Sequence, residues 1–445
     1  MKRKLFAALL AAAMLMSVMT GCGNTGEGSG SSGGSGTGGS SSDNSSAESA
    51  YTKPTGDVDL QVWYAVSGVT GETFEAQVKA YQEANPNIHI ELSYAGSYAD
   101  AAEKISANLM TGTAPDVALI AAGPLYTGGR GDFTMESLIE DPAFDKDDIY
   151  DGVWDYAMFD GRICAIPYGI SVPVLYYNKA ITDAAGIDME TEAPETWDEL
   201  YALAERAQRD GNINNSSTFY GFETSDAPWL FKSMLNQNGN TIINTDDGEI
   251  TPVYNDESAV EVAEFWQKLA ANGVMPVGEH SNAENTFLAG NCAFIVASSV
   301  RLARWSADPV VDFGVLPMPS FTQDSVALGG NVLVTFSEDA DKLAASWDLI
   351  KYLTNAENHT EFSLATGYLP IHESAMDMDI TKAAFEEDPR REIVFSQLEN
   401  AWSYWHFDAM GTMDVILGDM LSDLEGGSDV QTTLDDGVDE LLREM

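Results

Sequence analysis

The stretch VDLQVWYAVSGVTGETFEAQVKAYQEANPNIHIELSY (residues 58–94) carries two strand-like apolar segments with a helical segment between them. Phe74, Val78 and Tyr81 recur at the spacing of one helix face, so they predict an amphipathic helix. Asn85–Pro86 ends that helix, because proline cannot continue it. The stretch therefore predicts one strand–helix–strand unit.

The same alternation continues further along the chain. Ile105 and Leu109 fall on the face of another helix, and APDVALIAAG (residues 114–123) has the pattern of a third strand. This order predicts an α/β fold in which helices cover a parallel sheet. In PETWDEL, Thr196 and Glu199 have the spacing of a capping box, which predicts the start of a later helix.

Composition excludes several classes of partner. The chain has 445 residues and a formal net charge of −48, from 22 Lys and Arg against 70 Asp and Glu. Such a field repels nucleic acid and anionic lipid headgroups, so we expect neither as a partner. It also slows the arrival of anionic ligands unless a local basic patch compensates. Cys164 and Cys292 lie in apolar strand-like segments, where buried free thiols are the expected state and a disulfide is the alternative.

The N-terminal region has the pattern of a lipoprotein leader. Residues 1–21 combine three basic residues with a short apolar run, as in a bacterial signal peptide. The VMTGC segment resembles a lipobox, which implies that Cys22 becomes the lipid-bearing N-terminus. Residues 22–56 then form the anchor and a linker rich in glycine and serine. We therefore expect an extracytoplasmic protein attached to the membrane only through its lipid.

The sequence offers little that points to catalysis. The five histidines form no H-E-x-x-H motif and no close ligand pair, so we expect no metal ion, and no motif indicates a cofactor. The acidic segment DPAFDKDDIYDG (residues 141–152) lacks the spacing of a calcium loop and is predicted to be a solvated face. No catalytic residue is assigned. A glycosidase with two carboxylates remains open, because the separation of Asp and Glu side chains in space is not visible in the sequence.

Aromatic residues recur beside glycine and small hydroxyl residues. Their rings can stack on the C–H faces of a sugar while their polar tips form hydrogen bonds. For Trp63 and Trp347 a place in the core is the better interpretation. Tyr98 and Tyr368 lie in glycine-bearing loops, where a binding role is better supported.

An ordered set of motifs resembles the sugar-type family 1 extracellular solute-binding proteins, the receptors of ATP-driven uptake systems. The set spans residues 57–445 and comprises NPNIHIEL, TGTAPDV, DGRICAIPYGISVPVLYYNKAITDAAGID, PETWDEL, YGFE, NQNGN, FLAGNCAF, LGGN and TGYLP. Within that family the chain is most similar to the glycerol 3-phosphate and glycerophosphodiester receptors. By position, the resemblance implies these ligand-binding residues: Tyr98, Ser171, Trp229, Ser298, Ser299, Gly330, Asn331 and Tyr368.

Two departures from those receptors bear on the ligand. Ala121 stands at or near the position of an acidic residue that takes glycerol hydroxyls, and Ala409 stands where they place a phosphate-binding arginine. Losing a bidentate guanidinium removes the strongest phosphate contact. Arg301 could substitute, or it could be an exposed helix residue. We therefore expect a neutral carbohydrate, with a glycerol phosphodiester or glycerol 3-phosphate as the alternative.

The resemblance also implies the architecture and the partners. The fold would be two-lobed, like that of periplasmic binding proteins, with a hinge and a central ligand cleft. The N-lobe would hold residues 57–167 and 328–366, and the C-lobe residues 169–327 and 367–445. The protein would be a monomer that delivers its ligand to the permease subunits of an ABC importer. A secreted glycoside-active enzyme and a sensory or adhesion module are the competing hypotheses.

Overall fold

The computed structural model describes residues 51–122, 135–245, 248–278, 280–307 and 309–445. The predicted signal segment, Cys22 and the linker up to residue 50 lie outside the described residues. The predictions that rest on them are therefore taken up below only as proposals.

The first sheet contains the three strands predicted from the opening stretch and the segment after it. The strands β2, β1 and β3 run parallel, and β14 runs antiparallel to both β3 and β6. The predicted parallel arrangement is thus confirmed for the first three strands. In spatial order the sheet consists of β2 (Ile88–Tyr94), β1 (Val58–Tyr64), β3 (Val117–Ile120), β14 (Gly329–Thr335) and β6 (Ile166–Ser171).

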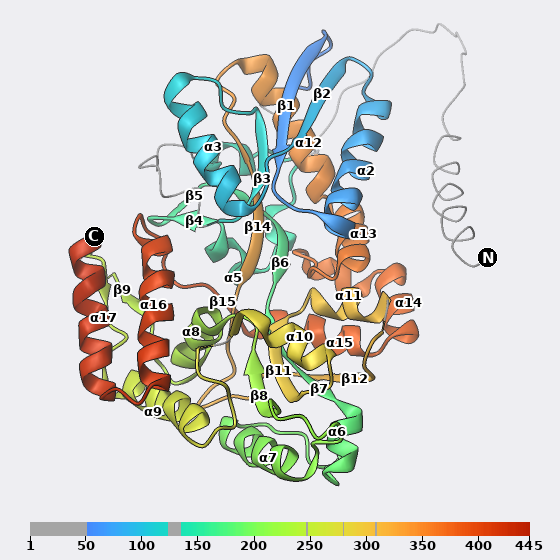
Figure 1. The fold of residues 1–445 in the computed structure, drawn as a ribbon. Coiled ribbons are helices and arrows are strands. Elements are labelled where there is room, and N and C mark those ends of the chain that lie inside the picture. The colour runs from blue at the N-terminus through green and yellow to red at the C-terminus, as the bar shows by residue number, and fades with distance from the viewer. Residues whose placement is uncertain (1–50, 123–134, 246–247, 279, 308) are drawn as a thin grey trace, which may run out of the picture. The chain divides into compact units, whose positions relative to one another are not determined.

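Helices pack around this sheet (Figure 1). Phe74, Val78 and Tyr81 are buried on α2, which confirms that face. Tyr81 donates a hydrogen bond to Asp348 on α12 at 2.7 Å. The helices beside the first sheet are α2 (Gly68–Ala84), α3 (Tyr98–Thr111), α12 (Ala340–Thr354) and α13 (Ala356–Thr366).

The second sheet is built mainly from the middle of the chain. Strand β7 runs antiparallel to β11 and β12, whereas β8 runs parallel to β11. Cys292 lies at the start of β11, and both it and Cys164 are buried free thiols, as predicted. In spatial order the sheet consists of β12 (Phe313–Leu316), β7 (Pro173–Asn178), β11 (Cys292–Ser298) and β8 (Tyr220–Thr224).

Helices from the middle and the end of the chain accompany the second sheet. The capping box at Thr196 and Glu199 is present at the start of α7, as predicted. The helices α16 and α17 pack side by side, and α16 also packs on α8 and α9 (Figure 1). These helices are α6 (Lys179–Ala184), α7 (Trp197–Asp210), α8 (Ala227–Gln237), α9 (Glu257–Ala271), α10 (Ala283–Leu288), α11 (Arg301–Ala307), α14 (Asp379–Glu387), α15 (Arg390–Ser396), α16 (Met410–Glu425) and α17 (Val430–Glu444).

Several short elements complete the described part of the chain. Three pairs of two-residue strands form small separate sheets, namely β9 with β10, β13 with β15 and β4 with β5. Their bounds are β9 (Ile243–Asn244), β10 (Thr251–Pro252), β13 (Val326–Ala327), β15 (Ala401–Trp402), β4 (Met158–Phe159) and β5 (Arg162–Ile163). The short helices are α4 (Glu136–Ile139), α5 (Asp151–Tyr156), η2 (Lys146–Asp148), η4 (His280–Asn282), η5 (Glu373–Asp377) and η6 (Gln397–Asn400).

The chain passes between the two sheets at short segments. Strand β6 ends at Ser171 and β7 begins at Pro173, so a single residue separates a strand of one sheet from a strand of the other. A second passage lies at Leu328, where the chain enters β14 of the first sheet after β12 of the second sheet and the short strand β13. We propose that these passages mark the boundary between the predicted lobes.

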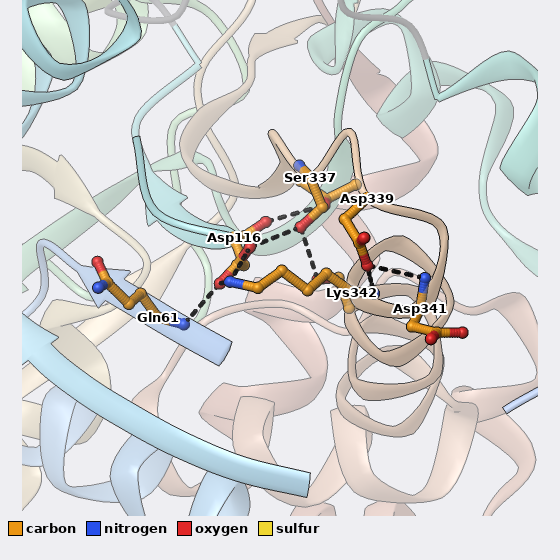
Figure 2. Close-up of polar contacts among 8 residues, drawn as sticks. Gln61, Asp116, Ser337, Asp339, Asp341 and Lys342 are labelled. Atoms are coloured by element: carbon orange, nitrogen blue, oxygen red, sulfur yellow. Dashed lines mark hydrogen bonds and ion pairs between the residues drawn. The ribbon is translucent and has the colours of Figure 1, made fainter. Parts of the chain in front are cut away.

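A buried carboxylate holds four elements of the first sheet region together (Figure 2). Asp116, just before β3, is 7% exposed and accepts a hydrogen bond from the backbone N–H of Gln61 on β1 at 2.8 Å. It also accepts from the Ser337 hydroxyl at 3.0 Å and pairs with Lys342 of α12 at 2.9 Å. The backbone carbonyl of Asp116 accepts from Thr335 at the end of β14. The cluster therefore fixes β1, β3, β14 and α12 to one another.

The prediction of a wholly solvated acidic face over residues 141–152 is wrong for its first residue. Asp141 is 3% exposed and accepts a hydrogen bond from the indole Nε1 of Trp347 at 2.9 Å. It also pairs with Lys351 at 2.8 Å. The tertiary partners on α12 make burial of this carboxylate possible, because a buried charge needs a counter-charge and hydrogen bonds. Trp347 itself is fully buried, as expected.

Candidate ligand-binding site

Two predicted ligand tyrosines lie together although they are far apart in the sequence. The hydroxyls of Tyr98 and Tyr368 lie close enough to affect each other's pKa, and both rings are half-buried. Burial raises the pKa of both phenols, so both stay protonated and can donate as well as accept hydrogen bonds. The structure thus brings together a pair of amphipathic rings with surface left for a ligand.

Local backbone features place the two rings. Tyr98 is the first residue of α3, directly after Ser97, whose side chain and that of Asp100 form a capping box. Tyr368 follows Gly367, which ends α13 in the left-handed conformation with φ of 84°. A side chain at Gly367 would lie 3.0 Å from the carbonyl oxygen of Val300, so glycine allows close contact with the start of α11. The Tyr368 ring stacks parallel to that of Phe362, with centroids 6.0 Å apart.

Strands β6 and β14 of the first sheet lie in close contact at Gly330. Gly330 has a φ of 125°, and a Cβ there would lie 1.8 Å from the carbonyl oxygen of Gly169. The side-chain oxygen of Asn331 accepts a hydrogen bond from the Gly169 N–H at 2.9 Å, and its Nδ2 donates to the Tyr98 hydroxyl at 3.1 Å. Asn331 has no exposed surface. We therefore propose that Asn331 positions Tyr98 rather than contacting the ligand.

Trp229, on α8 beside the second sheet, contacts the passage at Leu328. Its helix α8 starts after Asp226, whose carboxylate accepts a hydrogen bond from the Trp229 N–H at 3.0 Å. The indole Nε1 donates to the carbonyl oxygens of Ala327 and Leu328, at 3.1 and 3.3 Å. A Cβ at Gly329 would lie 3.0 Å from the indole ring, so glycine allows the half-buried ring to lie on the backbone.

The three predicted serines lie at the ends of β6 and β11, and they differ in exposure. Ser171 is buried and pairs with Gly329 in the first sheet. Ser299 is also buried, with its hydroxyl accepting from the backbone N–H of Val172 at 3.4 Å. Ser298 is half-buried and keeps accessible surface. Of the three, Ser298 is therefore the best placed to reach a ligand directly.

Sequence reasoning missed Tyr156, Lys232, Tyr404 and Asp414. Tyr156 donates a hydrogen bond to the carbonyl oxygen of Gly330 at 3.0 Å, and no local pattern singled it out. The Lys232 ammonium is 3.0 Å from the Tyr404 hydroxyl and pairs with Asp414 at 2.6 Å. Burial alone would lower the pKa of Lys232, but Asp414 and Tyr404 overcome this effect and raise it. The sequence did contain one sign of this buried charge, because Lys232 stands within the apolar segment WLFKSML.

Ala121 and Ala409, the two positions that differ from the glycerol 3-phosphate receptors, offer no polar side chain to a ligand. Ala409 is buried and Ala121 half-buried, and neither can bind a phosphate or accept a hydroxyl through its side chain. Arg301, the possible substitute, pairs through Nε with Glu284 at 2.6 Å. Arg301 also lowers the pKa of Tyr368 against the larger effect of burial, so its charge reaches the candidate site.

Within the residues that the structure describes, no group of three His, Cys, Asp or Glu is arranged to hold a metal ion. The helices in these same ranges include none with the length and apolar character needed to span a bilayer.

Comparisons with solved structures define the class of fold. The cyclic alpha-maltosyl-1,6-maltose binding protein from Arthrobacter globiformis has a TM-score of 0.76 at 23% identity, over 88% of this chain and 100% of that chain. UgpB from Mycobacterium tuberculosis, in complex with glycerophosphocholine, has a TM-score of 0.73 at 23% identity, over 87% and 98%. The fold is therefore the two-lobed α/β fold of solute-binding proteins, as predicted.

Sequence comparison places the chain within that class. The sn-glycerol-3-phosphate-binding periplasmic protein UgpB of Escherichia coli is 24% identical over 367 residues, which are 77% of this chain and 80% of the relative. A family model described as bacterial extracellular solute-binding protein matches residues 76–392. The chain belongs to this family, and the protein is a solute receptor.

Proposed function

We propose that the protein captures a neutral carbohydrate outside the cytoplasm and delivers it to the permease subunits of an ABC importer. The observations that carry this proposal are the pair of half-buried rings Tyr98 and Tyr368 and the half-buried ring of Trp229, which donates to the backbone at the Leu328 passage. Such rings stack on sugar faces, while the two phenols donate to and accept from sugar hydroxyls. Ser298 adds a further accessible hydroxyl.

The mechanism is closure of the two lobes around the ligand. A ligand stabilises the closed state only through contacts that the open state lacks, so it must contact residues on both sides of the hinge. Tyr98 belongs to the first sheet region and Trp229 to the second. Asn331 donates a hydrogen bond to Tyr98, and Tyr156 donates one to the backbone carbonyl of Gly330. Both Gly330 and Asn331 lie on β14, directly after the passage at Leu328. Ligand contacts to Tyr98 and Trp229 would thus be linked to the passage at Leu328, where the hinge would bend.

The proposal includes the attachment and the partners of the receptor. Cys22 would carry the lipid, and residues 22–56 would hold the receptor near the membrane while leaving it free to dock on the permease. The receptor would act as a monomer, without nucleic acid and without a cofactor. It would release its ligand chemically unchanged, so it would not be an enzyme.

A glycerol phosphodiester or glycerol 3-phosphate is the second candidate ligand. It is favoured by the names of two relatives, one a glycerol-3-phosphate-binding protein and the other solved with glycerophosphocholine. The pairing of Arg301 with Glu284 and of Lys232 with Asp414 opposes it, because each cation already has a carboxylate partner. We therefore place the neutral carbohydrate first.

A thermal-shift panel on the full-length chain tests the proposal. The panel contains mono- and oligosaccharides, polyols, glycerol 3-phosphate and glycerophosphocholine. A ligand of the native state raises the melting temperature by mass action, so we expect a rise with a neutral carbohydrate. Long incubation followed by analysis of the ligand should recover it intact. A rise only with the phosphate compounds would favour the second candidate, and a chemical product would contradict the receptor assignment.

Adjacent permease genes would oppose a sensory or adhesion module.

A further inference from the structure

We infer that Glu284 determines the selectivity of the ligand site, because it pairs with Arg301, offsets its positive charge and thereby disfavours phosphate esters. This inference rests on the proposed binding of a neutral carbohydrate and adds a residue that excludes the competing ligands.

The position of Arg301 follows from packing around the start of α11. Gly367 lies against Val300, directly before Arg301, and against Ala303, two residues after it. A Cβ on Gly367 would lie only 2.9 Å from the Cβ of Ala303, so the neighbouring Tyr368 is held beside the first turn of α11. Ser298, the accessible serine, ends β11 three residues before Arg301. Arg301 therefore lies in the helix turn beside Tyr368, close enough for its charge to lower the pKa of that phenol.

The ion pair offsets part of the positive charge of Arg301 and leaves it able to donate hydrogen bonds. Arg301 Nε donates to Glu284 Oε1 at 2.6 Å, and the side chains are 28% and 24% exposed. Partial burial makes the pair less sensitive to screening by salt than an exposed pair. Arginine carries five N–H donors, and the terminal nitrogens have no partner among the described residues. They remain available to neutral hydroxyl groups of a ligand.

A phosphate group would meet a different environment at the same place. Phosphate binds arginine best as a bidentate partner of an uncompensated guanidinium. Here the carboxylate of Glu284 already occupies one edge of Arg301 and repels a second anion. The other cation near the site, Lys232, is compensated in the same way by Asp414.

The test compares phosphate-ester binding by wild type and Glu284→Gln, using the full-length chain. Glutamine keeps the shape and one hydrogen-bond acceptor while removing the negative charge, so Arg301 becomes an uncompensated cation. We expect the affinity for glycerol 3-phosphate, measured by titration calorimetry, to rise at least tenfold. Binding of the carbohydrate found in the panel should change by less than about threefold, since its hydroxyls need donors rather than net charge. The double variant Glu284→Gln/Arg301→Gln should lose the gain.

Glu192→Gln is the matched control. Glu192 pairs with Arg206 at 2.8 Å on the α7 side of the second sheet region, so this variant makes the same change in net charge away from Tyr368. An equal gain in Glu192→Gln would overturn the inference, and so would unchanged phosphate affinity in Glu284→Gln that still binds the carbohydrate. If Glu284→Gln does not fold, Glu284→Ser takes its place with the same expected results. Failure of wild type to bind any carbohydrate would instead contradict the proposed function. That outcome does not depend on the ratio of glycerol 3-phosphate affinities between Glu284→Gln and wild type.

Discussion

At the scale of single residues, Asn331 shows how a buried amide can serve a binding site without touching the ligand. Both ends of its side chain are used, one on the Gly169 N–H and the other on the Tyr98 hydroxyl. A Cβ at Gly169 would clash with the Asn331 side chain at 2.4 Å, so the neighbouring glycine is part of the same arrangement. Removing such an amide would leave buried polar groups unpaired, which costs more than the net value of a hydrogen bond.

Replacement of Tyr368 tests the ring pair. Tyr368→Ala removes both the stacking surface and the hydroxyl, so we expect ligand affinity to fall more than tenfold, about 1.4 kcal/mol. The same loss is expected for Tyr98→Ala. Tyr368→Phe keeps the ring and should lose less affinity. Calorimetry with the identified ligand measures each change, and wild-type affinity in both alanine variants would remove these residues from the site.

A tyrosine away from the passages provides the control for these variants. Tyr201 lies on α7, where its hydroxyl donates to Glu205 at 2.6 Å. Tyr201→Ala also removes a partly buried ring, but it should leave ligand affinity unchanged. Melting temperatures of all variants separate a loss of affinity from a loss of fold.

At the scale of elements, the Asp116 cluster is the clearest device for holding the first sheet to α12. Asp116→Ala would leave the Gln61 N–H and the Ser337 hydroxyl without their partner and Lys342 without its counter-charge. We expect the free energy of unfolding to fall by about 3 kcal/mol. Urea unfolding measures it. Asp59→Ala, an exposed carboxylate on β1, is the control and should stay within about 0.5 kcal/mol of wild type.

Strand β8 carries a buried carboxyl group that makes stability depend on pH. Glu223 is 1% exposed, and its Oε2 has no hydrogen-bond partner in the described structure. Burial raises the pKa of Glu223 to about 8, with a smaller opposing effect from the Thr286 hydroxyl. The folded state thus keeps a proton that the unfolded state loses near its ordinary pKa of 4.5. This contribution to stability is complete below about pH 4.5 and disappears as the pH rises through about 8.

Glu223→Gln removes this dependence, because glutamine is neutral at every pH. We expect the variant to gain melting temperature relative to wild type as the pH is raised from about 5 to about 8. Differential scanning calorimetry at both pH values measures the gap between the two proteins. A gap that stays constant over this range would show that Glu223 does not hold a proton in the folded state.

At the scale of the whole molecule, the predicted lipid anchor at Cys22 can be tested separately from the folded part of the chain. Two acyl chains bind a bilayer stably, since each buried CH₂ contributes about 0.8 kcal/mol, whereas one chain is marginal. We therefore expect wild type in the membrane fraction and Cys22→Ala in the medium, detected by immunoblot of fractionated cells. Cys164→Ala should fractionate like wild type, because Cys164 is a buried thiol of the folded part. Retention of Cys22→Ala at the membrane would contradict the lipid anchor.

Much of the fold was predictable from the sequence, because local periodicity records which face of an element is buried. The spacing of Phe74, Val78 and Tyr81 gave α2, and the order of apolar segments gave the parallel strands β2, β1 and β3. The capping box at Thr196 was visible for the same reason, since both of its partners lie within one turn. The candidate ligand residues came from ordered motifs and remain predictions until ligand binding is measured.

By itself the sequence determined the alternation of strands and helices, the family and a formal net charge of −48, all of which depend on composition or on residues close in the chain. Only the tertiary structure decided that Asn331 is buried against Tyr98, 233 positions away, and that Asp141 is paired with Lys351. It also decided that Arg301 is paired with Glu284. The physical reason is that hydrogen bonds and ion pairs depend on distances of about 3 Å in space, which local sequence patterns do not encode.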